Sequence, residues 1–166
     1  MASVSRLILR LICVAALFVF SALLSSCSSA GKGSGGVVCK VKTFHLIPTE
    51  RFITSDRSID FERQYILHGA VTAADQQERA GQYYSFLWKV TDRTQPVTVK
   101  FQYRQANTGL EIQEMIQEVT DVRRSNWSKF QVTGPAYNGN GRVTAWKLTL
   151  SRAGEVLGSE QSYLWE

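Results

Sequence analysis

The chain has 166 residues, a formal charge of +5 and 44% apolar residues, enough to build the core of one domain. Its Lys and Arg residues are scattered singly and form no basic stripe, which argues against a nucleic-acid-binding protein. No Ser lies in a strained G-x-S-x-G elbow, and no cysteine or His stands at ligand spacing from Cys39. We therefore expect a protein that is not an enzyme and that needs no metal or cofactor.

Residues 1–26 have the composition of an export signal. Arg6 and Arg10 precede an apolar run over residues 11–24, and small residues follow that run. The run is shorter than the roughly 20 residues that a transmembrane helix needs. A basic start, a short apolar centre and small residues at the processing point are typical of a cleaved signal peptide. An uncleaved signal anchor, or an ordinary signal peptide with a coincidental cysteine, are the alternatives.

The end of this segment, Leu24-Ser25-Ser26-Cys27, resembles the lipobox of bacterial lipoproteins at every position. The resemblance implies cleavage between Ser26 and Cys27, a diacylglyceryl group on the Cys27 thiol, and acylation of the new amine, for instance with palmitate. Several acyl chains hold a protein in a membrane far more firmly than one. We therefore expect a lipid-anchored protein of the bacterial cell envelope. In enterobacterial lipoproteins, which this segment resembles, an Asp after the cysteine favours retention in the inner membrane. Because Ser28 and Ser29 follow Cys27 instead, the resemblance implies the periplasmic face of the outer membrane rather than the inner membrane.

The mature chain is predicted to begin with a tether. Removal of residues 1–26 leaves 140 residues, and the loss of Arg6 and Arg10 lowers the formal charge from +5 to +3. Residues 27–36 hold Cys27 and a Gly- and Ser-rich stretch that is typical of a flexible linker. With Cys13 removed and Cys27 lipidated, Cys39 is the remaining thiol, so no intramolecular disulfide is expected. Because Cys39 lies in the apolar run 37–41, we expect it to be a small buried hydrophobe.

Residues 37–166 are predicted to form a single antiparallel β-sandwich of seven or eight strands. Apolar and polar residues alternate without exception over residues 97–104, which is typical of a strand with one buried face. Turn-forming residues cluster at 92–96, 107–109, 138–141 and 152–154, where we expect hairpins or turns. Shorter alternating sets are Phe61, Tyr65, Leu67 and Val71; Tyr84, Phe86, Trp88 and Val90; and Trp146, Leu148 and Leu150.

The strand count, the length and an aromatic residue expected to be buried on a central strand, Trp88, resemble immunoglobulin-like or fibronectin type III-like sandwiches. No Cys pair flanks Trp88, so a disulfide-bonded immunoglobulin domain is excluded. Residues 110–122 allow two interpretations, of which we prefer an edge strand over a helix. Ile112, Ile116 and the polar residues between them favour a long edge strand, whereas Met115 and Val119, together with a capping-box pattern at Thr108 and Glu111, fit a helix.

Few polar residues of this sequence are candidates for catalysis or metal binding. His45 and His68 lie in strand-like runs and are expected to face solvent rather than to form a pair. Paired carboxylates for glycoside hydrolysis would have to come from a loose acidic group beside several arginines, which is more typical of a self-neutralising surface. The group consists of Asp56, Asp60 and Glu62, beside Arg51, Arg57 and Arg63.

Exposed aromatic rings are the best candidates for a ligand site, because sugars stack on them. Trp127 lies in a polar stretch, Tyr137 opens an Asn-Gly segment, and Trp165 lies near the C-terminus, where it binds ligand or caps the last strand. Two functions follow as expectations. One is a non-catalytic lipoprotein that binds or supports another envelope protein. The other is a module that binds peptidoglycan or polysaccharide, which would require two or three coplanar exposed rings.

Overall fold

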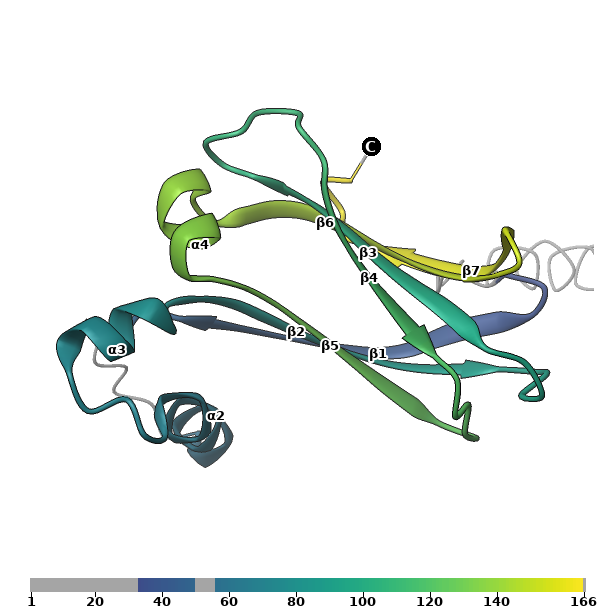
Figure 1. The fold of residues 1–166 in the computed structure, drawn as a ribbon, viewed down its shortest axis with the longest axis horizontal. Coiled ribbons are helices and arrows are strands. Elements are labelled where there is room, and N and C mark those ends of the chain that lie inside the picture. Colours follow the sequence, from purple (N-terminus) through teal and green to yellow (C-terminus); the bar gives the residue numbers. More distant parts are fainter. Residues whose placement is uncertain (1–32, 50–55, 166) are drawn as a thin grey trace, which may run out of the picture.

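The computed structural model describes residues 33–49 and 56–165, and these form two antiparallel sheets packed face to face (Figure 1). Sheet A has the strand order β1-β2-β5, and sheet B has the order β4-β3-β6-β7. The predicted all-β sandwich is therefore confirmed. The strands are β1 (Gly36–Leu46), β2 (Gly81–Val90), β3 (Val97–Gln105), β4 (Gln113–Val119), β5 (Asn126–Thr133), β6 (Val143–Arg152) and β7 (Glu155–Gln161).

The strand order is close to that of an immunoglobulin-like sandwich. The first, second and fifth strands share one sheet, and the third, sixth and seventh share the other. The fourth strand, β4, pairs with β3 instead of joining sheet A. Within 110–122, residues 113–119 form the edge strand β4 and not a helix, so the preferred interpretation is confirmed for this part of the segment.

Aromatic side chains fill the space between the sheets. Trp88, Phe86 and Phe101 are fully buried, and the Phe101 ring stacks on Phe130 with centroids 5.1 Å apart. The Trp88 indole Nε1 donates a hydrogen bond of 3.0 Å to the hydroxyl of Ser128, so the polar end of the ring is satisfied. The alternation over 84–90, 97–104 and 146–150 predicted these inward positions, with Trp146 partly buried at their margin.

A helical insertion lies between β1 and β2, formed by α2 (Arg57–Leu67) and α3 (Ala73–Glu78). The strand predicted from Phe61 to Val71 is therefore wrong. Asp56 caps α2 by accepting a 2.8 Å hydrogen bond from the Ser58 amide, which favours a helix start. Phe61 and Tyr65 are four residues apart, so they share one helix face, and their rings stack at 6.3 Å.

A third helix, α4 (Gly134–Asn140), replaces the hairpin turn predicted at 138–141. Pro135 lies in its first turn, where a missing amide hydrogen costs nothing, and Gly141 follows it with φ of 78°, a conformation that favours glycine. Figure 1 shows α4, α3 and α2 gathered at one end of the sandwich, which we call the helical end.

The path of β1 corrects two expectations. The register between β1 and β2 shifts between Val38 and Lys40, and Cys39 at this bulge is exposed, so its predicted burial is wrong. The Gly-rich stretch also joins the fold before the predicted boundary. Gly35 donates to the Leu157 carbonyl at 3.3 Å, and its own carbonyl accepts from Thr91 at 3.0 Å.

The predicted signal peptide, the cleavage position at Ser26 and the lipidated Cys27 lie outside the described residues. None of the helices that the structure describes is both long and apolar enough to cross a membrane.

Candidate functional site

The three candidate aromatic residues lie on three different parts of the molecule. Tyr137, on α4, faces the β1 end, where its hydroxyl lies 2.6 Å from Nε2 of His45. His45 is therefore half-buried and bonded, not the solvent-facing residue that was expected. His68 is exposed, but it follows α2 rather than lying in a strand.

Tyr137 belongs to a polar network that closes the helical end. Buried Gln105 donates to the carbonyls of Ala136 at 2.9 Å and Gly141 at 2.7 Å, which fixes α4 between the sheets. The Gln82 side chain accepts a hydrogen bond from the Val143 amide beside it. Since the Tyr137 hydroxyl is engaged in this closure, the residue supports the fold rather than a ring platform.

Trp165 is 8% exposed and covers the outer face of sheet B. The Arg104 guanidinium lies over its ring, 4.8 Å from the centroid, in a cation–π contact. The Trp165 carbonyl accepts a 3.0 Å hydrogen bond from the Gln161 side chain. These contacts fit a residue that caps the last strand better than one that binds a ligand.

Trp127 is the candidate that remains on the surface. It lies on β5, is 45% exposed, and has the Lys42 ammonium over its ring at 5.6 Å from the centroid. The outer face of sheet A around it carries exposed lysines, and we call this surface the basic face. It consists of Lys40, Lys42, Lys89, Trp127 and Lys129.

Strand register explains why the lysines share one side. Lys40 pairs with Leu87, which pairs with Trp127, so these three residues form one row across the sheet. The next row runs from Lys42 through Ser85 to Lys129. Because side chains alternate along a strand, Lys40 and Lys42 point to the same face at the bulged end of β1, and Lys89 joins them two residues beyond Leu87.

The two sheets differ sharply in charge. The three strands of sheet A contain no acidic residue. Sheet B is balanced, because its strands carry four basic residues and four acidic ones, and Lys100 pairs with Glu114 at 3.6 Å. The lysines on the outer face of sheet A thus have no carboxylate on their own strands to neutralise them.

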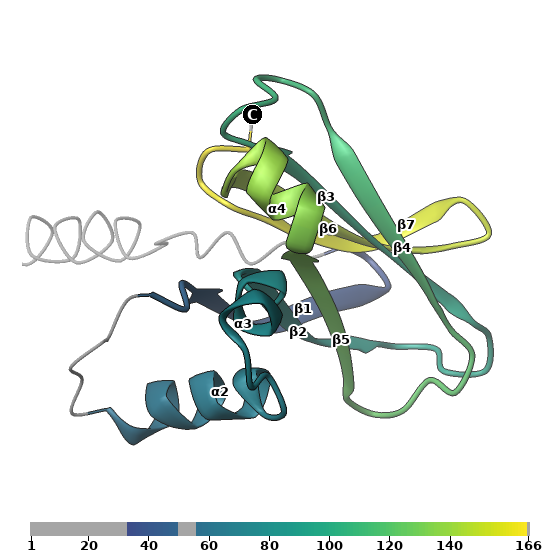
Figure 2. The same cartoon turned by 60° about the vertical axis from the view of Figure 1, so that its left-hand side comes forward.

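The helical insertion overhangs the basic face. Figure 2 shows α2 on the outer side of sheet A, apart from the strands. Two cavities, of about 740 and 510 Å³, open between the insertion and the sheet, and both are lined by Glu62, Tyr83 and Ser85. Lys129 lines the larger cavity and Lys42 the smaller one. We call the two together the insertion cleft; each cavity by itself has the size of an ordinary ligand site.

Arginine side chains hold the insertion in place. Arg79 donates to the carbonyls of Ile66 and His68, both at 2.6 Å, and so satisfies the free carbonyls at the end of α2. Arg63 donates to the Pro48 carbonyl at 2.8 Å, which ties α2 to the segment after β1. Since α2 and α3 contain no buried residue, these polar contacts carry much of the attachment.

The cleft also orders a tyrosine. The Tyr83 hydroxyl donates to the Arg79 carbonyl at 2.7 Å. Partial burial raises the pKa of Tyr83, and the nearby Arg79 charge opposes that rise. Of the acidic group considered for glycoside hydrolysis, Asp56 caps α2, whereas Glu62 lines the cleft.

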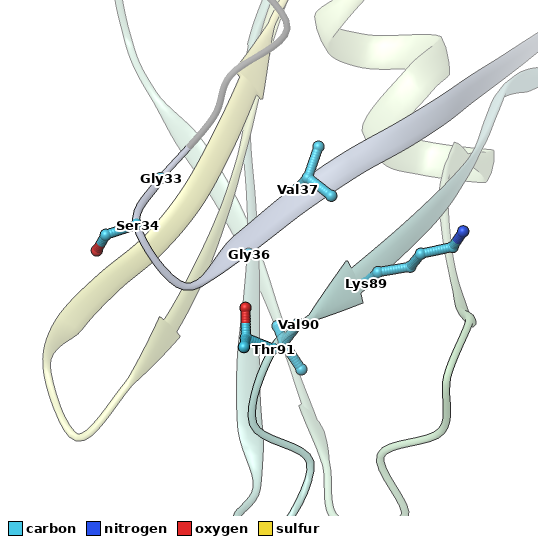
Figure 3. Close-up of a pocket in the computed structure, with 7 residues that line it drawn as sticks. All are labelled: Gly33, Ser34, Gly36, Val37, Lys89, Val90 and Thr91. Atoms are coloured by element: carbon cyan, nitrogen blue, oxygen red, sulfur yellow. The ribbon is translucent and has the colours of Figure 1, made fainter.

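A smaller cavity of about 370 Å³ lies at the end of the sandwich opposite the helical end, between the start of β1 and the end of β2. Figure 3 shows that its lining is mostly backbone and small side chains and that Lys89 points away from Gly33 and Ser34. This arrangement offers little to recognise a ligand.

The surface position of Trp127 agrees with the sequence-based expectation, whereas the basic face and the cleft were not predicted. A signal for the face was present, because residues 36–46, 81–90 and 126–133 hold lysines and no Asp or Glu. Among the described residues, no three His, Cys, Asp or Glu side chains gather to hold a metal ion. Comparison with family models, curated proteins and solved structures finds no match for this chain.

Proposed function

We propose that this chain is a membrane-anchored lipoprotein of the bacterial envelope whose sandwich binds another envelope protein without catalysing a reaction. The observation that carries the proposal is the pairing of the basic face with the insertion cleft. A charged, exposed sheet face beside an open cleft has the character of a recognition surface, since the charges of such surfaces steer partners of opposite sign.

The anchor part of the proposal rests on the lipobox-like sequence at 24–27. The described domain begins at Gly33, so the linker from Cys27 is short, and a flexible chain of that length spans only about 12–15 Å. Such a linker would keep the domain next to the bilayer. A partner would then be a membrane-embedded protein or one that works close to the membrane surface.

A glycan-binding module on the same anchor is the second function, and the exposed ring of Trp127 favours it. Its requirement for two or three coplanar exposed rings is met poorly by the three candidates, because Tyr137 closes the helical end and Trp165 is buried on sheet B. Protein binding is therefore the first choice.

The test is in-cell crosslinking of the full chain, with mass spectrometry of the captured material. We compare the wild type with Cys27→Ala, with a Lys42→Gln/Lys129→Gln double variant and with Lys147→Gln as a matched control on sheet B. The expected result is a reproducible protein partner that is lost with Cys27→Ala and depleted with the double variant, but retained with Lys147→Gln.

Two results would overturn the proposal. If Cys27→Ala stays in the membrane fraction with unchanged processing and mass, the lipid anchor is wrong. If only cell-wall fragments are captured, and Trp127→Ala abolishes that capture, the glycan-binding function takes the first place.

A further inference from the structure

We infer that the basic face and the insertion cleft bind an acidic polypeptide segment in an extended conformation. This inference rests on the proposed function and names the chemistry of the partner. Two observations carry it: the absence of acidic residues from sheet A, and the position of two lysines in the lining of the cleft.

Charge complementarity selects an acidic partner. Lys40, Lys42, Lys89 and Lys129 are all exposed, and the strands beneath them supply no carboxylate to neutralise them. The nearby carboxylates, on Glu62 and Glu78, belong to the insertion and line the larger cavity together with Arg79 and Lys129. A partner with carboxylates would therefore gain most by contacting the sheet rather than the helices.

The shape of the site favours an extended polypeptide chain as the partner over the flat surface of a membrane. Lys42 and Lys129 lie in cavities overhung by α2, which stands on the outer side of sheet A in Figure 2. A bilayer would meet α2 before it reached these two ammonium groups. An extended chain can enter between α2 and the sheet and pass both lysines.

The spacing of the lysines also fits an extended chain. Lys42 and Lys129 face each other across Ser85, in one row perpendicular to the strands, and Lys40 lies in the next row. Carboxylates on alternate residues of an extended segment project on one side, as required to meet a single face.

The experiment measures binding of a fluorescein-labelled poly-glutamate peptide to the full chain purified in a neutral detergent. Fluorescence anisotropy gives the affinity at low salt and at about 0.5 M salt. We expect saturable binding that weakens strongly with salt, because exposed charges are screened. The Lys42→Gln/Lys129→Gln double variant should bind about three- to tenfold more weakly. Lys147→Gln, on the outer face of sheet B, should bind like the wild type.

If Lys147→Gln weakens binding as much per charge removed as the double variant does, the inference is overturned, because binding would then follow net charge alone. The same holds if poly-glutamate does not bind while the detergent-free protein gathers on phosphatidylglycerol vesicles through the same lysines, since the basic face would then serve the membrane. A failure here leaves in-cell capture of a protein partner unaffected. Conversely, peptide binding would persist if the anchor proved wrong.

Discussion

The interior of the sandwich and the helical insertion are held together by different kinds of interaction. Between the sheets, fully buried aromatic and aliphatic side chains pack against each other. The insertion has no buried residue in α2 or α3 and is attached through arginine hydrogen bonds to carbonyls. The two regions therefore have different roles. The packed interior contributes most of the free energy of folding, whereas the insertion forms a cleft and contributes little to stability.

The largest effect is expected when the interior is opened. Phe86 is fully buried and its ring contacts Phe101, Phe130 and Trp146. Phe86→Ala should lower the free energy of unfolding by about 3–5 kcal/mol, because it removes a large buried ring and leaves a cavity. Urea denaturation followed by circular dichroism measures this change. Phe61→Ala, on the exposed face of α2, is the control and should lose less than about 1 kcal/mol.

A second, smaller effect should appear in alkaline solution. Burial raises the pKa of Tyr84 well above its ordinary value, and it also raises the pKa of Tyr103. In the unfolded chain these tyrosines lose their protons near pH 10, whereas the folded interior keeps them protonated. Their contribution to stability is thus complete below about pH 10 and is lost as the pH rises above it.

Tyr84→Phe should therefore make the unfolding free energy fall less steeply as the pH rises above about 10. Urea titrations at several pH values check this slope. Tyr163→Phe changes a tyrosine that is 96% exposed and should leave the wild-type slope intact. Identical slopes for Tyr84→Phe and the wild type would mean that Tyr84 is less enclosed than the structure shows.

The smallest change in overall stability is expected from releasing the insertion. Arg79→Ala removes two hydrogen bonds at the end of α2, so the amide hydrogens of residues 57–67 should exchange at least about tenfold faster. The amides of β2 and β3 should exchange as before. Hydrogen–deuterium exchange with mass spectrometry resolves the two regions, and Gln64→Ala, an exposed position on α2, is the matched control. Faster exchange throughout the sandwich would contradict the separation of the two regions.

The two regions also differ in how far the sequence predicts them. Strict alternation over 97–104 identifies β3 because one buried face demands an apolar residue at every second position. In the insertion, Phe61 and Tyr65 are four residues apart, a spacing that fits period two as well as a helix. The capping carboxylate of Asp56 was a local signal for the helix, and it outweighed the apparent alternation.

Long-range partners explain the remaining differences at the candidate site. The hydrogen bond between His45 and Tyr137 joins residues 92 positions apart, and no local sequence pattern predicts it. The bulge at Cys39 depends on how β1 registers against β2. The basic face was in principle visible, yet the sheet order was needed to place lysines from β1, β2 and β5 on one surface.

The bulge in β1 has a practical consequence. It turns the Cys39 thiol outward beside Lys40, and Cys39 is the free cysteine that the structure describes. A maleimide dye attached there would sit at the rim of the basic face, next to Lys40 on β1. Emission from such a dye would change when a molecule settles on the surface, so the native sequence already provides an attachment point for an optical reporter of occupancy.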